Sequence, residues 1–334
     1  MTSDPSPDPF DELTSTGTRK RLQLLGGRFE FASNSHQLLG LVDSAYADLP
    51  QHRLSTPMPR FQVKLLLGSH RHSPSRVEPP PLAMLCGPGF IGGATGASNL
   101  VVVSPLERNA LVVVSPQMAR FAYHTRYEMI EFAVFTLAAR SQGLVPLHAA
   151  CVGQGGSCLL LMGPSGSGKS TIALHCLLQG LEFVAEDGVF VAPDTMLATG
   201  IANFLHVRSD SLRWLGRSRD AARIRNSPVI RRRSGVKKYE VDLRRPGYRL
   251  AAHPPRIAAV VFLSALSAGE GPLMRPVRTS DMLKKLVANQ AYAANQPGWG
   301  TFVRNASRLT AFELRRGRHP LEAVDVLQTL LESR

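Results

Sequence analysis

The hydrophobic pattern of the chain changes character near residue 125. Before that point, short apolar runs rich in Val and Leu are separated by glycine and proline turn signals, which is typical of β-strands. The strands that this pattern predicts are residues 60–67, 82–85, 100–103 and 110–114. We therefore expect residues 22–125 to form a small β-rich N-terminal module.

After residue 125, helical periodicity alternates with short, fully apolar runs. Apolar residues at helical spacing predict a helix over residues 126–140, with Gly143 as its C-terminal cap. The other predicted strands are residues 146–152, 158–162, 182–185, 257–263 and 307–314, and the other predicted helices are residues 170–179, 280–295 and 321–331. This order predicts an α/β domain over residues 126–334 with a mainly parallel or mixed central sheet.

The composition indicates a folded protein and disfavours several classes. Of the 334 residues, 44% are hydrophobic, and no run approaches the roughly 18 uncharged apolar residues of a membrane helix. The chain starts with an acidic, proline-rich segment that lacks the basic flank and apolar core of a secretory signal. We expect residues 1–21 to be a disordered tail, and the protein to be cytoplasmic and to bind no membrane. Four cysteines without zinc-site spacing predict reduced thiols.

Most of the positive charge lies in one segment. Residues 208–249 hold 14 Lys or Arg and four acidic residues, a local net charge of +10 against +14 for the whole chain. A basic, flexible lid loop over a phosphate site, at about residues 209–240, is one interpretation, and a solvated charged loop is another. A nucleic-acid surface is disfavoured because few aromatic residues are interleaved with the charges.

The strongest motif follows the apolar run at residues 158–162. Its sequence, GPSGSGKS, fits G-x-x-x-x-G-K-[ST] at every fixed position, between a predicted strand and a predicted helix. Glycines let backbone amides approach phosphate oxygens, and the helix N-terminus adds a positive dipole. We expect Lys169 to contact the β- and γ-phosphates of ATP and Ser170 to coordinate Mg²⁺. The predicted nucleotide-binding residues are Gly163, Pro164, Ser165, Gly166, Ser167, Gly168, Lys169, Ser170 and Thr171.

Two acids and a histidine are predicted to lie beside this loop. Glu186 and Asp187 follow the strand predicted at residues 182–185, and the carboxyl ends of such strands line the ligand crevice of α/β sheets. One carboxylate, for which Asp187 is a candidate, can hold Mg²⁺ through water, and the other can accept a proton. His148 lies on the predicted strand 146–152, where an imidazole that faces the crevice can orient or share a proton with the carboxylates.

The segment LHAACVGQGGSCLLLMGPSGSGKSTIALHCLLQGLEFVAEDGVFV, residues 147–191, resembles the bacterial HPr kinase/phosphorylase family. The resemblance implies a P-loop kinase domain of HPr-kinase type and an ATP-dependent serine kinase. The N-terminal module does not look like that family's usual N-terminal domain. In this respect the chain looks more like divergent HPr-kinase-like proteins of bacterial gene clusters, which include kinases of ribosomally made precursor peptides such as lasso-peptide precursors. Family members assemble as hexamers, so the resemblance also implies a homo-oligomer.

The resemblance also implies roles for individual residues. His148 occupies the place of the family's active-site histidine, and Lys169 and Ser170 match its phosphate- and magnesium-binding residues. Glu186 and Asp187 stand where the family has two aspartates, one the general base and the other a metal-side acid. Glutamate at the first position keeps the charge but adds a methylene, which displaces the carboxylate by on the order of 1 Å.

The family's second signature, M-E-I-R-G-L-G, is only partly present. In its nearest match, residues 205–210, the arginine is kept as Arg208, His206 replaces the magnesium-binding glutamate, and the glycines are lost. The chain thus departs from the family at the second metal ligand, so the resemblance does not extend to this ligand or decide whether the chain has the family's reverse phosphorylase activity.

Together, these features predict an enzyme that transfers the γ-phosphate of ATP to a serine hydroxyl of a protein or peptide. Glu186 or Asp187, helped by His148, accepts the serine proton, and Lys237 or Lys238 of the basic segment closes over the phosphates. Arg208 is a further candidate for the lid or for phosphate binding. Guanine-nucleotide-binding enzymes are disfavoured because the chain has no N-K-x-D sequence, and transport ATPases are disfavoured because it has no L-S-G-G-Q sequence. Three alternatives remain open: a kinase of small hydroxylated molecules, a nucleotide-binding sensor with weakened catalysis, and, least favoured, a nucleic-acid-binding protein.

Overall fold

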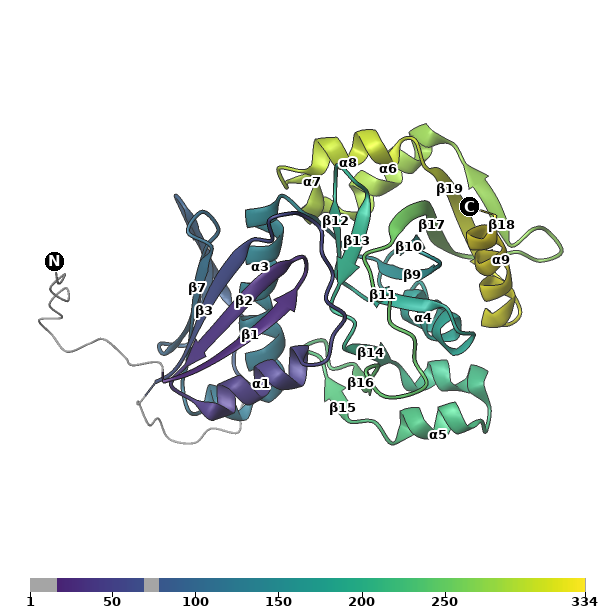
Figure 1. Ribbon diagram of the computed structural model, residues 1–334. Coiled ribbons are helices and arrows are strands. Elements are labelled where there is room, and N and C mark those ends of the chain that lie inside the picture. Colours follow the sequence, from purple (N-terminus) through teal and green to yellow (C-terminus); the bar gives the residue numbers. More distant parts are fainter. Residues whose placement is uncertain (1–16, 69–77, 334) are drawn as a thin grey trace, which may run out of the picture. The chain divides into compact units, whose positions relative to one another are not determined.

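The computed structural model describes residues 17–68 and 78–333, and the chain divides into two compact units (Figure 1). The first unit contains Phe29–Ala45 and Arg60–Leu137, with the described part of Met1–Leu22. The second unit contains Gln23–Arg28, Tyr46–Pro59 and Ala138–Arg334. The sequence places the boundary between residues 125 and 126, whereas the units separate between residues 137 and 138, inside a helix.

The first unit is built, in its described residues, around a seven-stranded sheet with the order β1-β2-β3-β7-β6-β5-β4. Its strands are β1 (Thr18–Leu24), β2 (Gly27–Ser33), β3 (Arg60–Leu67), β4 (Ala83–Gly87), β5 (Phe90–Thr95), β6 (Asn99–Ser104) and β7 (Asn109–Val114), and helix α1 (His36–Tyr46) follows β2. Strands β3 and β7 pair in parallel, whereas β4 to β7 pair antiparallel in succession. Strands β3, β4, β6 and β7 coincide with or overlap the four predicted ranges.

Strand β1 begins earlier than the sequence predicts. Because β1 starts at Thr18, the disordered tail predicted for residues 1–21 is wrong for residues 18–21, and residues 1–16 lie outside the described residues. Side chains alternate between the faces of a strand, so Arg19 and Arg21 point the same way. Both pair with Glu30 on β2, at 3.1 and 2.7 Å. The basic residues 19–21 therefore belong to a strand rather than to a disordered tail.

The second unit contains, in its described residues, a nine-stranded sheet with the main order β11-β9-β10-β17-β13-β12-β8; β19 joins it beside β17, and β18 beside β19. Its strands are β8 (Val145–Leu147), β9 (Ala150–Gln154), β10 (Ser157–Met162), β11 (Glu182–Ala185), β12 (Val189–Ala192), β13 (Leu197–Gly200), β17 (Arg256–Ser267), β18 (Met274–Val277) and β19 (Thr310–Arg316). Strand β17 pairs in parallel with β10 and β19, and antiparallel pairs join the others. The mixed form of the predicted sheet is therefore confirmed, and the mainly parallel form is wrong.

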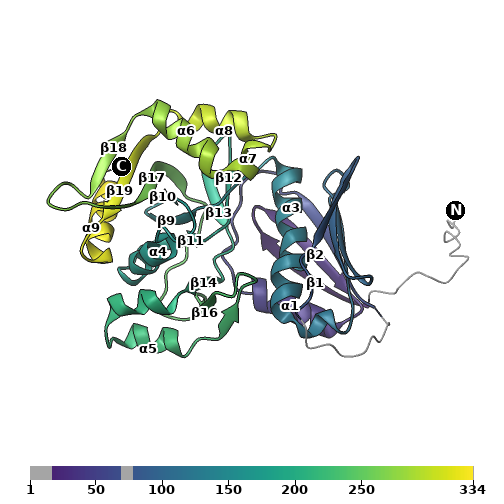
Figure 2. The same ribbon diagram turned by 180° about the vertical axis from the view of Figure 1, so that it is seen from behind.

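Helices pack against both faces of this sheet (Figures 1 and 2). The helices are α4 (Lys169–Leu178) and α9 (Pro320–Glu332) on one core, and α6 (Thr279–Asn289) and α8 (Trp299–Ala306) on the other. Residues of β10 alternate between them: Leu159 and Leu161 belong to the α4 and α9 core, and Leu160 and Met162 to the α6 and α8 core. Burial on both faces explains why residues 158–162 of β10 are all apolar. Among the described helices, none has the length and apolar character needed to cross a membrane.

Three predicted elements of the second half are interrupted or reassigned. The helix predicted at residues 126–140 starts as a π-helical turn, η2 (Thr125–Ile130), and continues as α3 (Glu131–Gln142), which Gly143 ends with a φ of +64°. The strand predicted at residues 146–152 breaks after Leu147 and resumes as β9. The helix predicted at residues 280–295 breaks at Gln290 into α6 and α7 (Ala291–Ala294).

The basic segment is folded rather than a flexible loop. Its elements are η3 (Ser209–Leu215), α5 (Arg219–Arg225), β15 (Val229–Arg231) and β16 (Lys237–Asp242). Strands β15 and β16 form a sheet of their own with β14 (Phe204–Val207), which directly precedes the segment. Leu212 and Ile224 are buried in the same core as α4. The lid loop predicted for about residues 209–240 is therefore wrong as a loop, because these apolar residues anchor it. The part without regular structure between β15 and β16 is residues 232–236.

The buried His175 on α4 makes the stability of this unit depend on pH. Burial, and secondarily the nearby His319, lowers the pKa of His175 from 6.5 to about 4. Between about pH 6.5 and 4, His175 is therefore protonated in the unfolded chain and neutral in the folded protein. We expect the free energy of unfolding to fall as the pH drops through this range, by at most about 3 kcal/mol. Urea unfolding at several pH values should show a shallower dependence in His175→Gln, and an unchanged slope would contradict this assignment.

Candidate functional site

The glycine-rich loop joins β10 to α4, as the sequence predicts. Gly163 follows the last residue of β10, and Gly168, with a left-handed φ of +105°, is the N-cap of α4. A side chain at Gly163 would place its Cβ 2.7 Å from Ser167 Oγ and 3.2 Å from the carbonyl oxygen of Leu263. The loop therefore needs glycine at Gly168 for its backbone angle and at Gly163 for space. It leads directly into the positive end of the α4 dipole.

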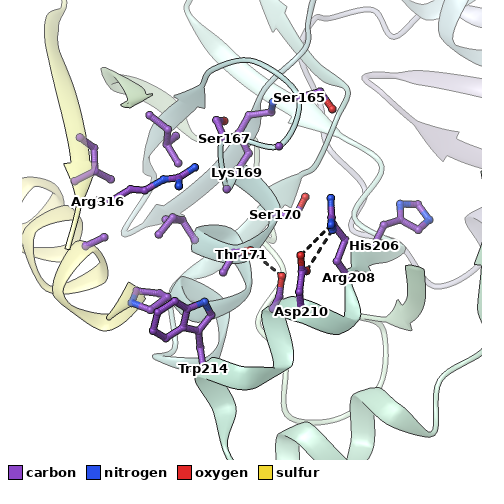
Figure 3. A pocket seen from close by; sticks show the side chains of 18 of the residues that line it. Ser165, Ser167, Lys169, Ser170, Thr171, His206, Arg208, Asp210, Trp214 and Arg316 are labelled. Carbon is purple, nitrogen blue, oxygen red and sulfur yellow. Dashed lines mark hydrogen bonds and ion pairs between the residues drawn. The ribbon is translucent and has the colours of Figure 1, made fainter. Parts of the chain in front are cut away.

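Polar groups of this loop point to an anion as its ligand. Lys169 Nζ donates to the carbonyl oxygens of Gly163 (2.7 Å) and Pro164 (3.3 Å), so the lysine spans the loop from inside (Figure 3). Burial lowers the pKa of Lys169, while the charges of Asp187 and Glu186 oppose this shift. Among the described residues, the buried Ser167 Oγ has no hydrogen-bond partner. A buried hydroxyl without a partner and an ammonium at a helix N-terminus fit phosphate oxygens.

Glu186 is the acid next to the hydroxyl of Ser170. It directly follows β11, and its Oε1 accepts a hydrogen bond from Ser170 Oγ. Its Oε2 accepts from the backbone N–H of His206 at 2.9 Å, and its side chain is 2% exposed. Burial, followed by the charge of Asp187, raises the pKa of Glu186. The pair of oxygens from Ser170 and Glu186 forms a site of the kind that a hard divalent cation prefers.

Asp187 lies beside Glu186 but in a different environment. Its φ of +63° turns the chain, and its Oδ2 accepts a hydrogen bond from Arg232 at 2.8 Å. Burial alone would raise the pKa of Asp187, but the hydrogen bond and charge of Arg232, with the charge of Lys238, hold it below its usual value. Adjacent carboxyl groups whose pKa values shift in opposite directions are typical of sites that divide acid and base roles. No described hydrogen bond joins Asp187 to Ser170, so the geometry favours Glu186 over the predicted Asp187 on the metal side.

His148 lies at the interruption between β8 and β9, not within a continuous strand as predicted. Its neighbours Leu147 and Ala149 are buried, whereas His148 is exposed and lines the same cavity as the glycine-rich loop. Although part of the side chain is open to this cavity, surrounding protein atoms and then the charge of Lys169 lower the pKa of His148; Asp187 opposes the shift. The structure thus brings His148, Lys169 and Asp187 together in one site.

A cavity of about 620 Å³ connects these groups. Besides the loop, His148 and Asp187, its lining includes the basic side chains of Arg208, Arg232, Lys238 and Arg316. Figure 3 shows Arg208 and its partner Asp210 on one side of the cavity and Arg316 on another, with Trp214 nearby. Of the two lysines predicted to close over the phosphates, Lys238 lines the cavity and Lys237 does not. Arg208, also predicted, lines it as well.

Sequence reasoning missed Arg232 and Glu240. Arg232 is one of three consecutive arginines, and only its place after β15 turns it toward Asp187. Glu240 is buried on β16 opposite His206 of β14, and His206 Nε2 lies 3.8 Å from Glu240 Oε1. His206 Nδ1 also lies 4.0 Å from Glu186 Oε2, so His206 lies between Glu186 and Glu240. The signal that could have identified Glu240 is its buried position on a strand with two lysines, and the sequence alone does not show that burial.

The described residues fit phosphate and a magnesium ion held mainly by phosphate. No group of three or more His, Cys, Asp or Glu among them could by itself hold a metal ion. Magnesium bound to a nucleotide takes most of its ligands from phosphate oxygens and water, and needs only one or two protein oxygens. Ser170 Oγ and the Glu186 carboxylate supply two such oxygens.

Comparisons with known proteins add little beyond this geometry. No family model matches the chain, and no curated protein matches it. Among solved structures, the chain is similar to the HPr(Ser) kinase/phosphatase from Coxiella burnetii, with 12% sequence identity over 56% of this chain and 88% of that one, and a TM-score of 0.27. Likeness at this level does not establish membership of a family or an activity.

Proposed function

We propose that the protein is an ATP-dependent kinase that transfers the γ-phosphate to a serine hydroxyl of a protein or peptide. One observation carries the proposal: a single cavity gathers the glycine-rich loop with Lys169, the carboxylate of Asp187 and the imidazole of His148. An anion-binding loop beside a proton acceptor is the combination that phosphoryl transfer to a hydroxyl requires.

The loop and its lysine hold the phosphates in this proposal. Backbone N–H groups at the start of α4 and Lys169 Nζ bind the β- and γ-phosphate oxygens, and Ser167 Oγ donates to one of them. Ser170 Oγ and the Glu186 carboxylate would hold Mg²⁺, and the ion, when bound, would supply positive charge next to the phosphates. The aromatic end of the cavity, where Trp214 packs against His319 with ring centroids 5.3 Å apart, takes the nucleobase.

Asp187 is the proton acceptor in this proposal. Glu186 is occupied by Ser170 and His206 and does not line the cavity, whereas Asp187 lines it and its lowered pKa keeps it ionised. The serine oxygen forms a bond to the γ-phosphorus, the bond from phosphorus to the bridging oxygen breaks, ADP leaves, and the serine proton passes to Asp187. The transition state of such reactions is loose, so Asp187 and His148 mainly orient the hydroxyl. Arg232 forms an ion pair with Asp187, and its guanidinium stabilises the negative charge that develops on the transferred phosphate.

The proposal is tested with γ-labelled ATP and two acceptor panels. The full chain is incubated with ATP and Mg²⁺ and with either a degenerate mixture of serine-containing peptides or a mixture of sugars and nucleosides. We expect label on serine in the peptide panel, identified by mass spectrometry. Label confined to the small molecules would replace the proposal by a small-molecule kinase, and ATP binding without transfer to either panel would favour a nucleotide sensor.

Strand β16 provides a matched pair of lysines for testing the basic segment. Adjacent residues of a strand face opposite ways, and only Lys238 of the pair lines the cavity. Burial lowers the pKa of Lys238, although the charges of Glu186 and Asp187 oppose this shift. We expect Lys238→Ala to lower kcat on the order of tenfold or more, because a charge near the phosphates is lost, and Lys237→Ala to change it less than twofold. Equal losses in steady-state assays would contradict a specific role.

A further inference from the structure

Gln290 is a buried polar residue that joins two distant parts of the second unit. It lies at the interruption between α6 and α7, with a non-helical ψ of 44°, and is 3% exposed. A glutamine at so buried a position must satisfy its amide within the protein. Its partners are therefore informative about its role.

Both polar atoms of the Gln290 side chain bind the backbone of His148. Gln290 Oε1 accepts from the His148 N–H at 2.7 Å, and Gln290 Nε2 donates to the His148 carbonyl oxygen at 3.1 Å. Two hydrogen bonds to one residue fix both the position and the rotation of its peptide units. The side-chain amide thus pairs with residue 148 as a neighbouring strand would, at the point where the strand pattern from β8 to β9 is interrupted.

The interruption has a consequence for the imidazole. Because Leu147 and Ala149 on either side are buried and residue 148 alone is exposed, a small rotation of the backbone here would carry the imidazole away from the loop and from Asp187. Without Gln290, the N–H and carbonyl oxygen of His148 would lose these two hydrogen bonds, which favours such a rotation.

We propose that Gln290 is a positioning residue for His148, which clamps the backbone at residue 148 so that the imidazole stays in the phosphoryl-transfer cavity. This inference rests on the proposed function. Gln290 itself is not among the residues that line the cavity, so it acts through His148 alone. The break in the helix predicted at residues 280–295 is what gives its side chain this direction.

Gln290→Ala and a matched control, Gln296→Ala, test the clamp. Gln296 is also a buried glutamine after α7, but its described side-chain hydrogen bond goes to the Tyr292 carbonyl oxygen. We expect Gln290→Ala to lower kcat on the order of tenfold while the Kd for ATP changes less than twofold, since the loop is built by other elements. Gln296→Ala should change kcat less than twofold.

A double-mutant cycle separates positioning from general destabilisation. In a His148→Ala background the backbone groups remain but the imidazole is gone, so Gln290→Ala should lower kcat no further. Gln290→Ala should still accelerate amide hydrogen exchange at residue 148 in the His148→Ala background, because Gln290 binds the backbone of residue 148 whether or not the imidazole is present. Exchange of the loop at residues 163–171 should stay unchanged.

Four outcomes overturn the inference. An equal kcat loss from Gln296→Ala, or a further loss in the His148→Ala background, would show a merely structural role. Unchanged exchange at residue 148 in Gln290→Ala would show that the clamp does not exist. A wild-type protein that transfers no phosphate would remove the proposed function and the positioning role with it, and the exchange measurement would then show separately whether the clamp is present.

Discussion

Lys169→Ala is expected to abolish transfer of the γ-phosphate from ATP while the protein remains folded. Lys169 Nζ already spans the loop through the carbonyl oxygens of Gly163 and Pro164, so it is held where phosphate would bind. Its loss removes a positive charge from a buried site, where such charges act with little screening. We expect a decrease of at least about 10³ in kcat/KM, or on the order of 4 kcal/mol of transition-state stabilisation. Label transfer and thermal unfolding are measured on the same preparation.

A matched control is available on α6. Lys284 is exposed and does not line the cavity. Lys284→Ala should therefore keep the rate of transfer within about twofold of wild type and change the free energy of unfolding by less than about 0.5 kcal/mol. Transfer that survives in Lys169→Ala would remove the glycine-rich loop from the proposed reaction. Loss of folding in Lys169→Ala would be visible as a changed unfolding curve, and Lys169→Met, which keeps the side-chain volume, would then take its place.

Asp187→Asn is the second variant with a large expected effect. The amide cannot accept the serine proton, and its pairing with Arg232 is weakened, so kcat should fall by about 10² to 10⁴ with little change in ATP affinity. Single-turnover transfer and nucleotide binding, measured separately, distinguish the two effects.

Glu186→Gln should differ from Asp187→Asn in kind. Glu186 contacts Ser170 rather than the cavity, so its amide should raise the Mg²⁺ concentration needed for half-maximal rate. The opposite result, with a changed magnesium requirement in Asp187→Asn and only a lower rate in Glu186→Gln, would exchange the roles of the two acids.

The sequence predicted the centre of the site well because its signals are local. The run at residues 158–162, the GPSGSGKS motif and the following helical pattern are contiguous, and they form β10, the loop and α4. Glu186 and Asp187 follow β11 as predicted, because a strand end is a local feature. The presence of these side chains near the loop then follows from the sheet bringing strand ends to one edge.

Features that depend on residues far apart in the chain could not be predicted from the sequence. The apolar run around His148 gives no sign of a break, because the group that binds its backbone, Gln290, lies 142 residues away. The order of strands in the sheet is equally non-local: β9 separates β10 from β11 and runs antiparallel to both, which makes the sheet mixed.

The loop predicted for the basic segment is wrong for a different reason. Its high charge indicated a loop, yet a few apolar residues such as Leu212 and Ile224 suffice to anchor η3 and α5 in the core. Which lysine faces the cavity depends on the register of the β15–β16 hairpin, and a run of adjacent cations does not reveal it.

A structure of the protein with ADP, Mg²⁺ and a planar phosphoryl mimic such as aluminium fluoride tests the account most directly. We predict the mimic within hydrogen-bond distance of Lys169 Nζ and the amides of residues 166–170, with Mg²⁺ on the side of Ser170 and Glu186. Asp187 and His148 should both face the open, in-line side of the mimic. A nucleotide bound elsewhere, or Asp187 and His148 separated from the mimic by more than a layer of water, would contradict phosphoryl transfer at this site.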